Sequence, residues 1–197
     1  MKIRLFLLGF ILSIPVLLRA SSVVQVTFDE LVSSSQFIFE GHVTERRAEF
    51  DNNGKIYTYV TFEVEDVLKG TFGGRTLVLR YLGGTVGDTT LRISDLTLPE
   101  TGEKGIYFVE SLTRPQVHPL YGWDQGHFLV ATSPTDQTER VFSRNRKPIT
   151  GVTTLPGKAS GLSTGTAMGV AVADASRSNE AMTVREFKQK VVELKSR

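Results

Sequence analysis

The stretch 56–65 constrains the fold more than any other part of the chain, because its side chains alternate without a break. Isoleucine, valine, phenylalanine and one threonine fall on one side, and tyrosine, threonine and glutamate fall on the other. Successive residues of a β-strand point to opposite faces, so this pattern predicts a strand with one buried face. The run Asp51–Gly54 is typical of a tight turn, and an alternating stretch at Phe37–Val43 precedes it. The sequence therefore predicts a long β-hairpin.

The alternation breaks near the end of this strand. The next apolar residues are Val67 and Leu68, and Glu65 and Asp66 stand before them. One inserted residue shifts the faces of a strand in this way, and such an insertion is a β-bulge. We therefore expect a bend at this point, with both acids on the solvent side, and the end of the strand at Lys69-Gly70.

Further strands are expected at 76–82, 90–94, 105–110 and 127–131, because turn-forming residues separate these runs. Five or six short strands without long helices between them are typical of a small antiparallel barrel or sandwich. A threonine followed three residues later by glutamate is the capping box that begins a helix, and Thr27 and Thr183 both start one. We expect a short N-terminal helix to about residue 34 and a C-terminal helix within 183–197. The apolar face of the latter should pack on the barrel through Val184, Phe187, Val191 and Leu194.

Residues 1–20 have the pattern of an export signal. Lys2 and Arg4 precede the apolar run Leu5–Leu18, and Ala20-Ser21 supplies small residues at which a signal peptidase cleaves. The run is about 14 residues long, whereas a bilayer span needs roughly 20. An uncleaved anchor is the alternative. The sequence thus predicts a periplasmic or secreted protein without stable membrane insertion after signal cleavage.

Charge and cysteine content narrow the expected chemistry. Residues 1–20 hold three basic residues and no acid, so their removal changes the formal net charge from +2 to −1. Short basic clusters occur at Arg46-Arg47 and at 144–147, but acids are spread among the other residues, so we expect no nucleic-acid partner. The chain has no cysteine, which excludes disulfides, thiolate metal sites and a thiol nucleophile.

The segment 143–182 differs from the expected β-barrel domain, 21–142. It is rich in Gly, Ser and Thr, and its glycines recur every fourth residue from 157 to 169. Each glycine costs a helix roughly 1 kcal/mol, so a helix is not expected here. We predict an extended or mobile loop that leads to the C-terminal helix. The alternative is a partner-binding segment that becomes ordered on contact.

Ser163 lies in a G-x-S-x-G pattern, which carries the nucleophile in α/β-hydrolases. In those enzymes the catalytic histidine follows the serine, whereas His42, His118 and His127 all precede Ser163. The three histidines also lack the short spacing of a zinc site. We therefore expect no catalytic residue, no metal and no cofactor. A hydrolase with a site built around Ser163 or the histidines is the alternative.

Three aromatic residues are candidates for a partner-binding surface. Tyr57 and Tyr59 lie opposite the core face of their strand, and Trp123 lies in an expected loop. Amphipathic aromatic side chains often anchor protein interfaces. The alternative is that these rings pack under the helices or the long loop.

One ordered set of motifs consists of Phe37–Val43, Val60–Val64, Val67–Gly70, Leu82–Gly87, Gly102-Glu103, Gly105–Val109 and Gln125–Phe128. This set resembles a family of exported bacterial proteins of uncharacterised function, over roughly residues 27–131 and, to a lesser extent, the final helix. Such domains are similar in layout to the OB-like barrel of netrin-type modules and tissue inhibitors of metalloproteinases. The resemblance implies this barrel and supplies no catalytic residues. Those inhibitors chelate the protease zinc through an N-terminal cysteine, so the absence of cysteine argues against inhibition here.

Taken together, the patterns predict a mainly β protein with a small antiparallel five- or six-stranded OB-like barrel, a short N-terminal helix and a C-terminal helix. Since no motif carries a reaction, we expect an exported, non-enzymatic binding or accessory module. Its expected partner is an envelope or extracellular protein that the residues do not identify.

Overall fold

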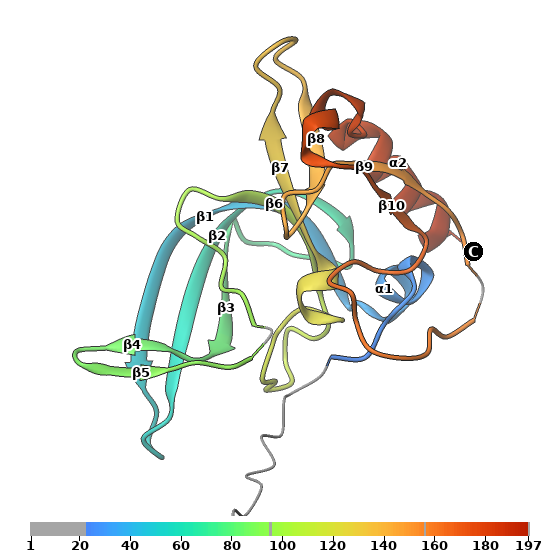
Figure 1. Cartoon of the computed structure of the whole chain (residues 1–197). Coiled ribbons are helices and arrows are strands. Elements are labelled where there is room, and N and C mark those ends of the chain that lie inside the picture. Colours follow the sequence, from blue (N-terminus) through green and yellow to red (C-terminus); the bar gives the residue numbers. More distant parts are fainter. Residues whose placement is uncertain (1–22, 95, 156, 197) are drawn as a thin grey trace, which may run out of the picture.

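The computed structural model describes residues 23–94, 96–155 and 157–196, so the predicted export signal lies outside the described residues. The protein is mainly β, as predicted, with 42% strand and 17% helix. Figure 1 shows a bent sheet with helices α1 (Phe28–Ser34) and α2 (Val184–Lys195) side by side near one end. The short hairpin of β4 (Gly84–Val86) and β5 (Thr89–Leu91) lies at the other end.

The predicted hairpin forms the centre of the sheet. Strand β1 (Phe37–Phe50) pairs antiparallel with β2 (Ile56–Lys69). In the turn, the Asp51 carboxylate accepts hydrogen bonds from the backbone N–H groups of Asn53 and Lys55, at 2.9 and 2.8 Å. These short-range bonds hold the turn, and the turn holds the strands in register.

The predicted bulge is confirmed. The pairing register shifts by one at Glu65, which has no partner residue on β1. A second shift follows at Leu68, and Val67 and Leu68 pack against different apolar clusters. Leu68 is 5% exposed. Glu65 and Asp66 are both exposed, as expected. In addition, Glu65 lies 2.9 Å from Lys104 and Asp66 lies 2.7 Å from Lys188, in an ion-pair cluster described below.

Four more strands complete a six-stranded antiparallel sheet in the order β3-β2-β1-β6-β7-β8. No ladder joins the outer strands β3 and β8 among the described residues, and no closed barrel is detected. The strand predicted at 90–94 is instead the shorter β5, which pairs with β4 outside the main sheet. Strand β8 was not predicted. The bounds are β3 Thr76–Leu82, β6 Lys104–Val109, β7 His127–Thr132 and β8 Glu139–Ser143.

Two apolar clusters pack on this sheet. One, here called the strand cluster, comes mostly from β1, β2, β3 and β6. The other, the helix cluster, fills the space between the sheet and the two helices. Neighbouring residues of β1 alternate between them: Phe37 and Phe39 belong to the first and Ile38 to the second. Both faces are therefore buried at the start of β1 and along β6, which explains the continuous apolar runs there.

Both helices begin at the predicted capping boxes. Thr27 and Thr183 each accept a hydrogen bond from the N3 backbone N–H, and the N3 glutamate accepts one in return. Helix α2 buries Phe187, whose ring meets those of Phe28 and Phe128 at 5.5 and 4.8 Å. Helix α2 thus packs on the sheet through the predicted apolar face, whereas the barrel that was expected to support it is not detected among the described residues. In the described part of the chain no helix is long and apolar enough to cross a membrane.

The segment after β8 contains more regular structure than the sequence suggests. Strands β9 (Ile149–Val152) and β10 (Val170–Val172) pair with each other, and a 3-10 helix follows at Ala175–Glu180. The backbone N–H of Met168 donates to the Val26 carbonyl at 2.8 Å. The segment is thus bonded to the N-terminal part of the described chain, through partners too distant in sequence for local patterns to indicate.

Candidate functional site

Tyr57 and Tyr59 lie together on the face of β2 that points away from the strand cluster, as the alternation predicts. Both are partly exposed, and an arginine covers each ring. The Arg80 guanidinium lies 4.4 Å from the centre of the Tyr57 ring, and that of Arg47 lies 5.7 Å from the Tyr59 ring. Tyr59 pairs with Arg47 on β1 and with Arg80 on β3, so the strand register places both arginines beside the two tyrosines.

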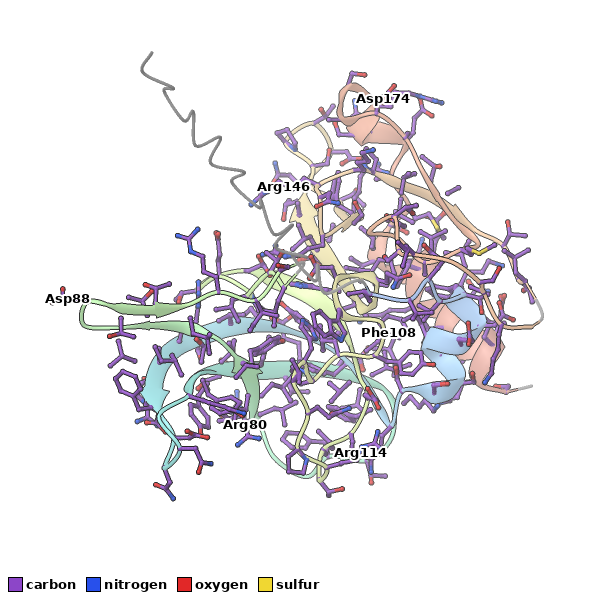
Figure 2. All side chains as sticks on the ribbon, turned by 60° about the horizontal axis from the view of Figure 1, so that its bottom comes forward. Arg80, Asp88, Phe108, Arg114, Arg146 and Asp174 are labelled. Carbon is purple, nitrogen blue, oxygen red and sulfur yellow. The ribbon has the colours of Figure 1, made fainter. Side chains whose placement is uncertain are left out.

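These side chains and their neighbour Val78 form one surface, here called the tyrosine face. Val78 lies on β3 and is 52% exposed, which is unusual for a valine in a strand. Figure 2 labels Arg80 on the outside of the sheet. Guanidinium groups stacked on tyrosine rings are held in place before any partner binds, so this surface offers preorganised aromatic, cationic and apolar contacts.

Trp123 lies elsewhere. It begins the 3-10 helix η1 (Trp123–Gly126) with a φ of +58°, and its ring stacks on His118 with centroids 5.3 Å apart. His118 in turn contacts Tyr81, a member of the strand cluster. Trp123 is therefore associated with the face of the sheet opposite to Tyr57 and Tyr59. The structure does not bring the three predicted aromatic residues into one surface.

A cavity of about 500 Å³ lies beside Trp123 and is also lined by Asp124 and Ser163. The Ser163 hydroxyl accepts a hydrogen bond from the Gly165 backbone N–H at 3.0 Å, and no histidine lies in hydrogen-bonding contact with it among the described residues. Asp124 accepts a bond from the Thr97 hydroxyl at 2.9 Å, and burial raises the pKa of its carboxyl. The cavity thus combines a serine and an acid without a base next to the serine.

His118 stacks on Trp123, which lines this cavity, but the protonation state of its ring makes it unsuitable as a base. Its Nδ1 accepts a hydrogen bond from the Leu120 backbone N–H at 3.1 Å. Burial lowers the pKa of His118 to about 3, so the ring is neutral and carries its proton on Nε2. Neither ring nitrogen then has a free lone pair to accept a proton.

The other two histidines lie in ion-pair clusters at separate places. His42 Nδ1 lies 2.8 Å from Glu65, on the partly exposed side of β1. His127 Nε2 lies 2.9 Å from Glu103 and is almost fully buried. No group of three or more His, Asp or Glu side chains in the described part of the chain could hold a metal ion.

The cluster around Glu103 is the most buried charged site in the described structure, and sequence reasoning missed it. The Glu103 carboxylate contacts His127 and, at 2.8 Å, the Arg144 guanidinium, which also donates to the Leu98 carbonyl at 3.1 Å. The exposed fractions of the three side chains are 9, 1 and 7%. Glu103 precedes β6, His127 begins β7 and Arg144 follows β8, so the cluster ties three strands together.

Electrostatics assign a charge to each member of this cluster. Burial alone would raise the pKa of Glu103, but His127 and Arg144 outweigh it and hold that pKa below its usual value. Burial likewise lowers the pKa of His127, and the carboxylate only partly offsets this. The cluster is therefore an ion pair between an ionised Glu103 and a cationic Arg144, and a neutral His127 contacts the same carboxylate.

A second cluster surrounds Glu40, which is 4% exposed on β1. Lys104 lies 3.2 Å from its carboxylate and Lys188 of α2 also contacts it. Lys104 further contacts Glu65 and Glu139 at 2.9 and 2.7 Å. Burial would lower the pKa of Lys104, but the three carboxylates raise it. This cluster connects α2 to the sheet and accounts for the acids at the bulge.

Comparison with known proteins adds no assignment, since no family model, no curated protein and no solved structure matches the chain. Among the residues singled out from the sequence, the structure brings together Tyr57 and Tyr59 and adds Arg47 and Arg80 to them. The buried cluster had a partial signal, because Glu103 and His127 lie in the motifs Gly102-Glu103 and Gln125–Phe128. Nothing in the sequence connects these motifs to Arg144.

Proposed function

We propose that this protein is an exported, non-enzymatic binding module that recognises an envelope or extracellular protein through the tyrosine face. The observation that carries the proposal is the stacking of Arg47 and Arg80 on Tyr59 and Tyr57, next to the exposed Val78. Tyrosine and arginine are enriched at interface hot spots, where they combine a large apolar area with directed hydrogen bonds. Such a surface suits a partner with an apolar patch flanked by carboxylates.

The architecture in this proposal is the OB-like barrel implied by the family resemblance. An OB fold is a partly open five-stranded barrel. The order β3-β2-β1-β6-β7, with a strand cluster fully buried on one face, is compatible with such a barrel. Export rests on the signal pattern of residues 1–20 alone, and sequencing the N-terminus of the exported protein tests it. An intact Met1 in the membrane fraction would contradict export.

The binding function can be tested by photo-crosslinking. A photoreactive amino acid at Val78 should give a discrete crosslinked product with envelope proteins, and the double variant Tyr57→Thr/Tyr59→Thr should abolish it, since threonine preserves strand propensity but removes both rings. Val192 on α2 is a matched control position, because it is also an exposed valine, at 44%. Equal products from both positions, or a product that persists without the rings, would refute the proposal.

The hydrolase alternative has one supporting observation, the shared cavity of Ser163 and Asp124. It requires a base, and the neutral His118 does not provide one in this arrangement. A fluorophosphonate probe, which labels activated serines, separates the two functions. We expect no labelling of Ser163, whereas labelling that disappears in Ser163→Ala would favour the hydrolase.

A further inference from the structure

A cavity of about 810 Å³ lies outside the tyrosine face. One wall comes from Arg46, Ala48 and Thr58, on the strand-cluster face of β1 and β2, and the other from the β4–β5 hairpin and the residues after it. Figure 1 shows this hairpin lying across the end of β1 and β2, and Figure 2 labels Asp88 at its tip. The volume is in the range of small-molecule sites, roughly 300–1,000 Å³.

The floor of the cavity is held in place by hydrogen bonds. The Thr58 hydroxyl donates to the Gly83 carbonyl at 2.7 Å, and the Gly83 backbone N–H donates to the Ile56 carbonyl at 2.8 Å. Gly84 has a φ of +133°, and a Cβ atom there would lie 2.3 Å from the Thr58 hydroxyl oxygen. Only glycine fits at this position, so the backbone itself forms the floor, and the site is preorganised.

The wall formed by the β4–β5 hairpin and the residues after it holds four aliphatic residues that remain partly exposed to water. A ligand with an apolar body would remove part of this surface from water, which stabilises the complex in proportion to the area covered. The four are Leu91, Ile93, Leu96 and Leu98.

Two arginines give the cavity its charge. Arg46 and Arg92 both line it, both are exposed, and neither has an ion pair among the described residues. Arg46 pairs with the buried Val60, so it lies on the cavity side of β1, whereas its neighbour Arg47 points to the tyrosine face. Glu100 is the one carboxylate among the described lining residues. Guanidinium groups bind carboxylates and phosphates through paired hydrogen bonds.

We propose that this cavity binds a small amphipathic anion, a carboxylate or phosphate on an aliphatic body. The aliphatic walls cover the body, and Arg46 and Arg92 hold the acidic group. This site is independent of the tyrosine face, so either proposal can fail without the other.

Calorimetric titration of the protein, below the micelle-forming concentration of each probe, tests the proposal. Decanoate and decyl phosphate should bind, and decyltrimethylammonium, with the same chain and the opposite charge, should bind at least about tenfold more weakly. Each methylene removed from decanoate should weaken binding by up to about fourfold, the factor that corresponds to about 0.8 kcal/mol per buried methylene. Binding of only one of the two anions still supports the proposal and identifies the acidic group.

Variants locate the site. Arg46→Gln and Arg92→Gln should each weaken decanoate binding by about five- to tenfold, while Arg47→Gln, on the same strand but the other face, should change it less than twofold. Glu100→Gln should strengthen binding by about two- to threefold. In the unmodified protein, decanoate should shift the amide resonances of Gly83 and Gly84. Absence of binding, equal effects at Arg46 and Arg47, or shifts confined to other regions would overturn the proposal.

Discussion

Replacing Glu103 by glutamine tests whether the buried ion cluster stabilises the fold. The substitution keeps the size of the side chain and removes its charge, which leaves the Arg144 guanidinium, 7% exposed, without its anion. Removing one partner of a buried ion pair typically costs about 3–5 kcal/mol, since the remaining charge stays buried without compensation. Arg144 keeps its bond to the Leu98 carbonyl at 3.1 Å, so we expect a loss near the lower end, about 3 kcal/mol.

Two further variants separate burial from charge. Glu49→Gln breaks the pair with Arg47, whose members are 40 and 63% exposed, and should cost less than about 1 kcal/mol. The double variant Glu103→Gln/Arg144→Met removes both charges of the buried pair. It should be less destabilised than Glu103→Gln alone, because no buried charge is left unpaired.

Urea titration gives the free energies of unfolding, with far-UV circular dichroism as the main signal. Fluorescence of Trp123, the single tryptophan of the chain, adds a local signal near the cluster. The two signals should give one transition with an unchanged m-value. If Glu103→Gln stays within about 1 kcal/mol of the parent protein, or if the double variant is destabilised at least as much as Glu103→Gln alone, the inference that this pair stabilises the fold is wrong.

Three other predictions follow from the structure. Leu68→Ala should cost about 2–5 kcal/mol in the same titration, because it truncates a buried side chain at the bulge. Asp66→Asn should cost less than about 1 kcal/mol, because the Asp66 carboxylate, 2.7 Å from Lys188, is 53% exposed. Burial lowers the pKa of His118 to about 3, so stability should be full above about pH 6.5 and fall as pH decreases toward 3; His118→Asn should flatten this dependence in urea midpoints measured across pH. The backbone N–H of Met168, bonded to the Val26 carbonyl, should exchange slowly in the isolated protein, and exchange at the rate of an unstructured chain would support the mobile loop predicted from sequence.

The parts of the fold that were predictable depend on neighbours in the sequence. The alternation at 56–65 fixes both the strand and its buried face, and a capping box at Thr27 or Thr183 joins residues three apart. Strand β3 has the predicted bounds, 76–82, for the same reason. Each of these signals is complete within a few residues.

The parts that were missed depend on partners distant in the chain. Strands β9 and β10 are four and three residues long, too short to show a period, and they pair across the segment between them. The prediction at 90–94 failed in extent because β5 pairs with β4, whose start requires the positive φ angles that Gly83 and Gly84 adopt. A barrel closes only if its two edge strands, which are far apart in sequence, pair with each other. The number of predicted strands does not determine whether they do.

The arginine doublet Arg46-Arg47 shows why the sites were only half predictable. In the sequence the two residues form one basic cluster, and composition argues that it does not bind nucleic acid. A strand places adjacent side chains on opposite faces, so the pair is divided. Arg47 stacks on Tyr59 of the tyrosine face, while Arg46 lines the cavity under the β4–β5 hairpin. Alternation alone could have predicted that Arg46 and Arg47 point to opposite faces. The Tyr59 ring beside Arg47 depends on the register of β1 with β2, and the cavity beside Arg46 depends on the position of the β4–β5 hairpin.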